Sequence, residues 1–393
     1  MKQGILTINA GSSSIKFALF PLARPISPEA EVSGQIDGIG TNATRLVAKN
    51  RAGERIADQM IAGEAVSHTV ALDAMLRWFL SAYAGWQIVA VGHRVVHGGE
   101  RYAQPIQVDD TVLGHLESFI PLAPLHEPHN VAGIRALQAL LPDVPQIACF
   151  DTAFHRSQPD VAQLFALPRA LTAEGIKRYG FHGLSYEFIA RALPEHSHRA
   201  NGRVIVAHLG NGASMAAMVN RKCVATTLGF STIDGLMMGT RCGNIDPGVI
   251  LHLMETKGFS VKDMTRILYK ESGLQGVSGI SQDMRTLLAS DKPEAAEAVE
   301  LFCYRIAREL GSLVAAAGGI DALVFTGGIG EHAAEVRRRV CLQSEWLGLR
   351  LNPEANARHD IVISAANSPV DVLVIPTNEE WMMAHHAQTL LAL

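Results

Sequence analysis

The chain has 393 residues, of which 48% are hydrophobic, and a formal net charge of −4 at pH 7. This length and apolar content are enough for two hydrophobic cores, and the small negative charge argues against nucleic-acid or anionic-membrane partners. The apolar run Ile5–Ile8 is too short for a signal peptide, and no stretch is apolar for long enough to span a bilayer. Five cysteines without metal-ligand spacing favour reduced thiols, so we expect a cytoplasmic α/β protein.

A strand, a turn rich in Gly, Ser and Asn, and a second strand are predicted over residues 5–20, and the same pattern returns at residues 204–219. Such turns expose backbone N–H groups and hydroxyls with few bulky side chains in the way, which suits phosphate. Two copies therefore predict a duplicated domain that holds one polyphosphate from both sides. A pair of ordinary β-hairpins would give the same pattern.

Apolar periodicity and turn residues predict the other elements of the first half, which are a helix over 64–84, a strand at Ile88–Val91, a helix from Asn130 to before Pro142, and a strand at Gln146–Phe150. The last of these strands delivers Asp151 at its carboxyl end. Strand ends are where open α/β sheets collect ligand-binding side chains.

The second half repeats this organisation, with strands within 203–229, a helix start at Asp246 and Pro247, a capping box at Ser260 and Asp263, helices at 281–289 and 293–317, and strands at Ala322–Thr326 and Val372–Pro376. The strand ending at Thr326 opens into the glycine-rich segment Gly327–His332 and another helix. Glu379 follows the last strand and precedes a terminal helix. Since no flexible linker is evident, we expect the two halves to pack around a central cleft.

The glycine-rich segment after Thr326 fits a nucleotide loop, although it has neither the GxGxxG spacing of dinucleotide folds nor a P-loop pattern. A tight strand-to-helix turn is the alternative interpretation. Arg94 and Arg241 lie in glycine-rich, polar surroundings, where arginine commonly forks onto a carboxylate or phosphate. A surface arginine paired with a nearby acid would look the same.

Asp151 and Glu379 are candidate magnesium ligands, because Mg²⁺ is often held by one or two carboxylates beside substrate phosphates. A helix N-cap or a surface position is the alternative for each of them. His182 precedes a predicted helix and could donate a hydrogen bond to an anion. The histidine pairs at 93/97 and 126/129 lack the Glu of a zinc HExxH helix, which disfavours a histidine metal site.

Taken together, several segments resemble the acetate kinase family in order and spacing from residue 5 to residue 380. They are Asn9–Lys16, Gly92–Glu100, Leu122–His126, Phe150–His155, Arg178–Gly183, His208–Ser214, Met238–Arg241 and Phe325–Glu331. The resemblance implies a duplicated actin-like (ribonuclease H-like) α/β fold with two domains and a central cleft. Residues 1–150 with the helix 382–393 would form the N-terminal domain, and residues 151–381 the nucleotide-binding C-terminal domain.

The resemblance also implies reversible transfer of the ATP γ-phosphoryl group to acetate, giving acetyl phosphate and ADP, with Mg²⁺ or alternatively Mn²⁺ as the metal, and a homodimer. It assigns the metal to Asn9 and Glu379, catalysis to Asp151, His182, Arg241 and Arg94, and the acyl pocket to Arg94, Arg241, Val96, Leu125 and Phe181. It assigns the phosphates of ATP to Ser12, Ser14 and Lys16 and to His208, Leu209, Gly210, Asn211 and Gly212. Around the adenosine it places Asp283, Met284 and Arg285, together with Gly328, Ile329, Gly330, Glu331 and His332.

The chemistry agrees with these roles. A carboxylate is already a nucleophile at neutral pH, so positioned cations matter more than a strong base. The sequence departs from the family pattern at Glu127, where Asn is common, at Leu184–Tyr186, at Cys242 and Asn244, and at Thr232, which stands near a frequent proline. The last departure leaves open a propionate or other short-chain acid kinase. A sugar kinase of the same superfold would need an Asp base, and a nucleotide-switched protein of actin or Hsp70 type is a more remote alternative.

Overall fold

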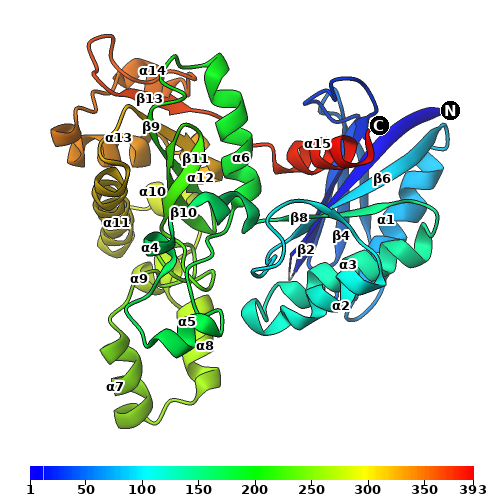
Figure 1. Ribbon diagram of the computed structural model, residues 1–393, viewed down its shortest axis with the longest axis horizontal. Helices are drawn as coiled ribbons and strands as arrows, with labels where there is room; N and C mark the ends of the chain where they lie inside the picture. The colour runs from blue at the N-terminus through cyan, green and yellow to red at the C-terminus, as the bar shows by residue number, and fades with distance from the viewer. Residues whose placement is uncertain (12) are drawn as a thin grey trace. The chain divides into compact units, whose positions relative to one another are not determined.

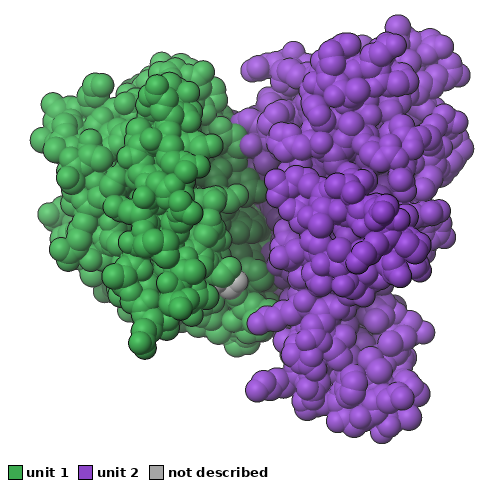
Figure 2. Space-filling view, turned by 180° about the vertical axis from the view of Figure 1, so that it is seen from behind, with its two compact units in different colours: residues 1–153, 378–393 green, residues 154–377 purple. Residues whose placement is uncertain are grey.

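Two β-sheets organise the chain in the computed structural model, which describes residues 1–11 and 13–393. The chain divides into two units, which are Met1–Ala153 with Asn378–Leu393, and Phe154–Thr377, coloured separately in Figure 2. The predicted boundaries after residues 150 and 381 differ slightly from this division. As a result Asp151 and Glu379 both belong to the first unit.

The sheet of the first unit has the strand order β5-β4-β3-β2-β1-β6-β8-β7. Its strands are β1 Lys2–Ala10, β2 Ser14–Pro21, β3 Val32–Asp37, β4 Arg45–Asn50, β5 Arg55–Met60, β6 Trp86–Val95, β7 Ile106–Gln107 and β8 Gln146–Phe150. Its helices are α1 His68–Ala82, α2 Asp110–Ser118, α3 Glu127–Leu140 and α15 Glu379–Leu391, with a short 3₁₀ turn at Ile120–Leu122.

The sheet of the second unit has the order β11-β10-β9-β12-β13. Its strands are β9 Arg203–Leu209, β10 Ala213–Val219, β11 Lys222–Thr226, β12 Ala322–Thr326 and β13 Asp371–Val374. Its helices are α4 Asp160–Gln163, α5 Arg169–Ala173, α6 Gly183–Ala192, α7 Pro247–Lys257, α8 Val261–Lys270, α9 Gly273–Ser278, α10 Met284–Leu288, α11 Pro293–Ala317, α12 Gly327–His332, α13 Ala334–Gln343 and α14 Pro353–Ala357. Figure 1 shows their order along the chain.

The two sheets share one topology. In the first, β3, β2 and β1 are antiparallel neighbours, and β6 and β8 continue from β1 in parallel. In the second, β11, β10 and β9 correspond to the antiparallel strands, and β12 and β13 to the parallel ones. The duplicated α/β fold predicted from the repeated strand–turn–strand pattern is therefore confirmed.

Each sheet buries its faces under helices. In the first unit, α1 and α3 contribute Leu72, Phe79 and Leu137 to the core that covers β1 and β2. On β6, a Cβ at Gly92 would lie 3.0 Å from the main-chain oxygen of Met383, so a glycine allows α15 to pack closely against this strand. In the second unit, α6 supplies Tyr186 and Ile189 to the core. No helix in the described part of the chain is both long and apolar enough to cross a membrane.

The predicted helix starts are mostly found. Asp246 caps α7 by accepting from the Gly248 N–H, and Ser260 and Asp263 form the expected capping box of α8. The helix predicted over 64–84 begins later, at His68, because the side chain of Ser67 accepts from the Val70 N–H and caps it. For the glycine-rich segment after β12, the sequence left open a nucleotide loop or a tight strand-to-helix turn, and in the structure α12 begins directly after the strand, at Gly327.

Candidate active site

In the first unit, three neighbouring strands bring Asn9, Arg94 and Asp151 to one edge of the sheet. In the sheet register, Ile8 of β1 pairs with His93 of β6, and Arg94 of β6 pairs with Cys149 of β8. Asn9 and Arg94 follow the first of these pairs, and Asp151 lies two residues beyond Cys149. Arg94 Nε donates to both carboxylate oxygens of Asp151 at 3.0 Å, and its Nη2 donates to Asp151 Oδ2 at 2.5 Å. Arg94 Nη1 donates to Asn9 Oδ1 at 3.1 Å. The guanidinium is thus held in a fixed orientation by side chains from both adjacent strands.

The Arg94–Asp151 pair is strongly shielded from water. The Asp151 side chain is fully buried and that of Arg94 is 17% exposed. Burial opposes the charge on Arg94, but the Coulombic attraction and hydrogen bonds of Asp151 dominate and raise the pKa of the guanidinium. The guanidinium therefore keeps its positive charge at the strand edge, although the ion pair as a whole carries no net charge.

Two further carboxyl groups lie close to this pair. Burial raises the pKa of Glu379 to about 7. The negative charge of Asp151 also raises this pKa, whereas the positive charge of Arg94 lowers it. Burial likewise raises the pKa of Glu127 to about 8, although the Glu127 carboxylate accepts a hydrogen bond from the His97 N–H. The site thus holds more acidic groups than one guanidinium neutralises, and a further cation would be favourable there.

Glu379 is the first residue of α15, where Asn378 caps the helix by accepting from the Trp381 N–H. Among the described residues, no group of three or more His, Cys, Asp or Glu side chains is arranged as a metal site. Mg²⁺ is commonly held by one or two protein oxygens, with water and phosphate completing its shell. Asn9 and Glu379 therefore remain the expected ligands.

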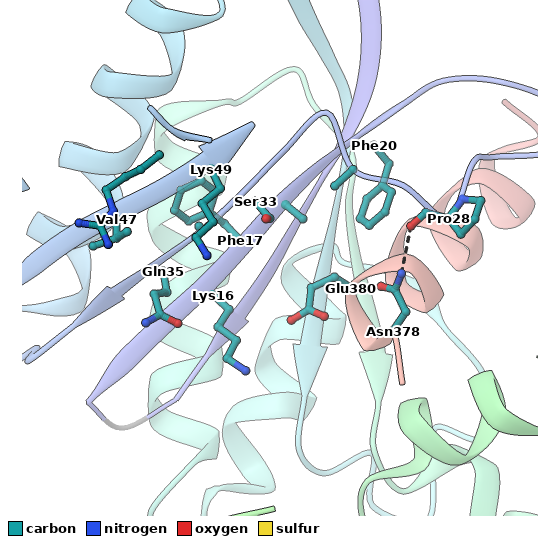
Figure 3. A pocket seen from close by; sticks show the side chains of 14 residues that line it. Lys16, Phe17, Phe20, Pro28, Ser33, Gln35, Val47, Lys49, Asn378 and Glu380 are labelled. Atoms are coloured by element: carbon teal, nitrogen blue, oxygen red, sulfur yellow. Dashed lines mark hydrogen bonds between the residues drawn. The ribbon is translucent and has the colours of Figure 1, made fainter. Parts of the chain in front are cut away.

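Lys16 and Glu380 line a cavity of about 670 Å³ in the first unit. In Figure 3, Lys16 comes from β2 and extends into this space beside Gln35, and Glu380 approaches from α15. Asn378 Nδ2 donates to the Pro28 carbonyl at 3.0 Å and closes one side. Lys16 is thus exposed, and its assignment to the ATP phosphates stays a prediction. Ser14 begins β2, whereas the predicted phosphate ligand Ser12 lies outside the described residues.

In the second unit, the turn after β9 brings three predicted site residues together. A Cβ at Gly212 would lie 3.4 Å from His182 Nε2 and 3.8 Å from Arg241 Nη1, so both side chains reach this glycine. The rings of His182 and His208 stack with centroids 4.4 Å apart. Two polar side chains therefore converge on a phosphate-type turn whose glycine leaves room for a ligand.

Hydroxyl groups set the orientation of these histidines. His182 Nδ1 lies 2.8 Å from Ser214 Oγ, and His208 Nδ1 lies 2.8 Å from Ser185 Oγ. Ser214 Oγ is itself 2.5 Å from the hydroxyl of Tyr186. His182 precedes α6 with a left-handed φ of 59°, which turns the chain sharply at this point. The sequence pointed to the histidines. It assigned no role in fixing them to Ser185, Tyr186 and Ser214, although these residues lie in segments noted above.

The loop of Arg241 is fastened directly to the phosphate turn. The Gly239 N–H donates to the Asn211 carbonyl at 3.0 Å, and Arg241 Nη1 donates to the Thr232 carbonyl at 2.9 Å. The Thr240 carbonyl accepts from the Ser272 N–H at 3.0 Å, which anchors the far side of the loop at α9. Arg241 is therefore positioned by the main chain on both sides of it.

The predicted adenosine segments lie on α10 and α12. Asp283 caps α10 by accepting from the Arg285 N–H, and hydrogen bonding to the Arg285 side chain lowers the pKa of Asp283 to about 2. Met284 is buried. On α12, the Glu331 carboxylate turns back and accepts from the Gly327 N–H at 2.9 Å and the Thr377 N–H at 3.2 Å. Glu331 thereby stabilises the conformation of α12, the helix to which it belongs.

The predicted acyl-pocket residues divide between the units, with Val96 and Leu125 in the first and Phe181 in the second. Val96 and Phe181 are each 1% exposed, and Leu125 is partly exposed. The Val96 N–H donates to the Asn130 side chain, which in turn donates to the Ala10 carbonyl. Asn130 thus joins the acyl-pocket strand to the first phosphate turn, a role that the sequence reasoning missed.

The chain is similar to known proteins over nearly its whole length. The model of the acetokinase family matches residues 4–385. An acetate kinase of Rhodopseudomonas palustris is 53% identical over 391 residues, which cover 98% of each chain. A crystal structure of a propionate kinase from Francisella tularensis superposes with a TM-score of 0.90 at 36% identity and covers 98% of this chain and 99% of that one. A crystal structure of the Porphyromonas gingivalis acetate kinase superposes with a TM-score of 0.87 at 35% identity and covers 99% of this chain and 100% of that one.

Proposed function

Because the chain belongs to the acetokinase family, we propose that it transfers the γ-phosphoryl group of ATP to acetate, forming acetyl phosphate and ADP reversibly. An acetate oxygen forms the new P–O bond while the bond between the γ-phosphorus and the bridging oxygen breaks, and ADP leaves with that electron pair. No proton has to be removed from a carboxylate for this attack.

The ion pair in which Arg94 donates to both carboxylate oxygens of Asp151 is the observation that supports this proposal most directly. A sugar kinase needs an Asp that is available to take a proton from a hydroxyl, whereas both oxygens of Asp151 accept from Arg94. Asp151 is therefore suited to orient the guanidinium, which in turn can bind the acetate carboxylate. Good positioning of reacting groups is worth roughly 7–11 kcal/mol in the best model reactions.

His182 and Arg241 are assigned to the transferring phosphoryl group. Charge spreads over its equatorial oxygens in a loose transition state, and two positioned donors beside the turn of Gly212 can compensate it. Their positions are fixed in advance by Ser214 and the Thr232 carbonyl, so little reorganisation is needed during the reaction.

The metal assigned to Asn9 and Glu379 is Mg²⁺, with Mn²⁺ as an alternative. When bound, it would offset the negative charge of the ATP phosphates. Glu379 is suited to this role because its carboxyl group is crowded by Asp151 and Glu380 and gains from a nearby cation. Asn9 already offers its Oδ1 as an acceptor to Arg94 and has a second lone pair for another cation.

ATP itself is assigned to the segments that the resemblance selects. Ser12, Ser14 and Lys16 in the first unit and His208–Gly212 in the second would contact the phosphates. Asp283–Arg285 and Gly328–His332 would surround the adenosine. The exposed ammonium of Lys16 and the converging side chains at Gly212 support this assignment.

We further propose a cytosolic homodimer. None of the five cysteines forms a disulfide in the described structure, which suits a reducing compartment. Helix α7 buries none of its residues within the described chain although it carries Val249 and Leu251, the latter 58% exposed. Apolar side chains left exposed on one helix favour a protein interface, and a second copy of the chain is the occupant that the resemblance implies.

Trapping of the product as acetyl hydroxamate tests the proposed activity. Purified protein is incubated with ATP, Mg²⁺, hydroxylamine and each acid from formate to butyrate. We expect hydroxamate with acetate that depends on both ATP and enzyme. Absence of hydroxamate with every acid, from protein that is folded by circular dichroism, would refute the assignment.

A further inference from the structure

Arg337, on α13, is an arginine whose side chain is fully buried in the second unit. No carboxylate among the described residues forms an ion pair with it. Its guanidinium instead uses all five of its N–H groups on neutral acceptors. Nε donates to Asn356 Oδ1 at 2.7 Å, and Nη1 donates to the carbonyls of Gly330 and Glu331, each at 2.8 Å. Nη2 donates to the Asn356 carbonyl at 2.8 Å and faces His359 Nδ1 at 2.9 Å.

Such a charge is costly to bury, and burial lowers the pKa of Arg337 to about 10. The acceptors offset part of the cost because they lie at the carboxyl-terminal ends of α12 and α14, where the partial charge of a helix is negative. A neutral side chain would leave the carbonyls of Gly330, Glu331 and Asn356 without these donors. The unfavourable burial of this charge is therefore linked to holding these three main-chain carbonyls in place.

Two of these carbonyls, those of Gly330 and Glu331, belong to α12. Arg337 fixes the Gly330 and Glu331 carbonyls from one side, and the Glu331 carboxylate binds the Gly327 and Thr377 N–H groups from the other. Gly327 has a φ of 76°, and a Cβ there would lie 2.9 Å from the Leu209 carbonyl, so only glycine fits. The segment is thus held at both ends in one conformation.

We propose that Arg337 is a positioning residue for the adenosine part of ATP, acting through the carbonyls of Gly330 and Glu331. This inference rests on the proposed function, because that function assigns Gly328–His332 to the nucleotide. Arg337 holds this segment in its binding conformation before the nucleotide arrives. Its loss should weaken nucleotide binding while acetate binding and the chemical step stay intact.

Arg337→Lys is the main test, since lysine keeps the charge but has only three donors on one nitrogen and cannot reproduce the fork. We expect KM for ATP and the Kd for MgADP to rise about tenfold, the scale of lost hydrogen bonds to a charged group. The kcat at saturating ATP and KM for acetate should stay within about twofold. Hydrogen exchange of amides in residues 327–333 should become faster in Arg337→Lys.

Arg203→Lys is a matched control, because Arg203 also makes several hydrogen bonds in the second unit but binds Asp321 and the Gly318 carbonyl. It should lower the melting temperature without changing KM for ATP. If Arg337→Lys does not fold, Asn356→Ala decides. It removes the acceptor of Nε and the hydrogen bond from Asn356 Nδ2 to the Ala334 carbonyl, keeps the other four hydrogen bonds of Arg337, and should raise KM for ATP about threefold.

The outcomes separate the two proposals. Unchanged KM for ATP and unchanged hydrogen exchange in Arg337→Lys, or in Asn356→Ala if that variant must be used, would overturn the role of Arg337. Equal losses for ATP and acetate would also overturn it, since they indicate general destabilisation. Wild-type protein that does not bind MgADP would instead refute the nucleotide assignment on which the proposal rests.

Discussion

Arg94 differs from a surface arginine in being held by two side chains and almost closed off from water. Its partner Asp151 is fully buried, so its orientation is set before any ligand binds. We predict that Arg94→Ala and Arg241→Ala each lower kcat by about 10² or more, because positioned charge at a transferring phosphoryl group is worth a few kcal/mol. Steady-state kinetics of folded variants measure this.

Arg241→Lys should recover little activity, because a point charge cannot replace the planar fork that binds the Thr232 carbonyl. Arg45→Ala, which removes an exposed ion pair with Asp58 on the first sheet, serves as the control and should leave kcat unchanged. Near-normal turnover of folded Arg241→Ala would remove that residue from the mechanism.

Glu127 is a fully buried carboxyl group at the start of α3, where the family commonly has Asn. Its pKa in the folded protein is raised to about 8 from 4.5, because burial disfavours the anion. Between these values the unfolded chain has lost the proton that the folded chain keeps, so this group makes stability fall as pH rises from about 4.5 to about 8. His97, whose main chain donates to it, stays neutral because burial lowers the pKa of its imidazole to about 4.

Glu127→Gln should therefore stabilise the protein relative to the wild type by an amount that grows between pH 5 and pH 8 and then levels off. Melting temperatures of both proteins across this range measure the effect, and Glu117→Gln, which removes an exposed partner of Arg135, is the control. A stability difference that does not change with pH would show that Glu127 is already ionised in the folded state.

The chain length of the acid that the acyl pocket accepts is the property of the site that the sequence predicts least well. Thr232 stands near a position where proline is frequent, and its carbonyl binds Arg241. We predict that kcat/KM for propionate lies within about tenfold of that for acetate, the scale of one buried methylene. Butyrate should be clearly worse, because a further methylene would overpack the site around Phe181. A preference for butyrate would show that the pocket residues are misassigned.

At the scale of elements, the close approach of α15 to β6 places Glu379 near Arg94. Gly92→Ala would bring a Cβ to 3.0 Å from the Met383 oxygen and 3.1 Å from its Cβ, so α15 must shift. We predict a loss of about 1–3 kcal/mol in the free energy of unfolding and a higher Mg²⁺ requirement. Denaturant melts and Mg²⁺ titrations of activity test this.

Gly114→Ala is the matched control, since it lies inside α2 with open space around its Cβ. It should stabilise the protein by about 0.5–1 kcal/mol, because glycine weakens a helix interior. Gly92→Ala that is as stable as the wild type would mean that α15 can move without cost.

The sequence predicted elements with strong periodicity or clear caps. The strands β8 and β12 and the long helix α11 were predicted with their observed ends, and the capping box of α8 was read directly from Ser260 and Asp263. The short helices α4 and α5 offer too few turns for a pattern to stand out. In α13, Arg337 occupies a position that a hydrophobicity pattern counts as exposed, so neither its burial nor its partners could be foreseen.

Within the site, sequence identified the candidate ligand-binding residues but not most of the side chains that support them. Arg94, His182 and Arg241 stand out as charged or titratable groups in glycine-rich loops. Asp151 is itself a candidate from the sequence, but its pairing with Arg94, like the contact of Ser214 with His182, depends on strand register and on contacts across many residues. Such pairings emerge only when the sheet is assembled.

At the scale of the whole molecule, the duplicated topology gives each half a strand–turn–strand element, for which phosphate binding is predicted, and α7 lies outside this repeated framework (Figure 1). Its apolar residues Val249 and Leu251 are exposed. We predict a dimer by light scattering coupled to size-exclusion chromatography. Leu251→Glu should yield monomers, because a charge would be buried in the interface. Val161→Glu changes an apolar residue that is 78% exposed on α4 and should leave the dimer intact. A monomeric wild type, or a dimeric Leu251→Glu, would place the interface elsewhere or exclude it.

The proposed mechanism depends most on the phosphoryl acceptor being a carboxylate bound by Arg94 and not a hydroxyl activated by Asp151. The direct measurement offers the protein [γ-³²P]ATP and Mg²⁺ with acetate and a panel of sugars and polyols together, and then treats the products with hydroxylamine. An acyl phosphate releases its label under this treatment, whereas a sugar phosphate keeps it. We predict that all transferred label is released by hydroxylamine and that it requires acetate. Label that survives hydroxylamine and depends on a sugar would contradict the central claim.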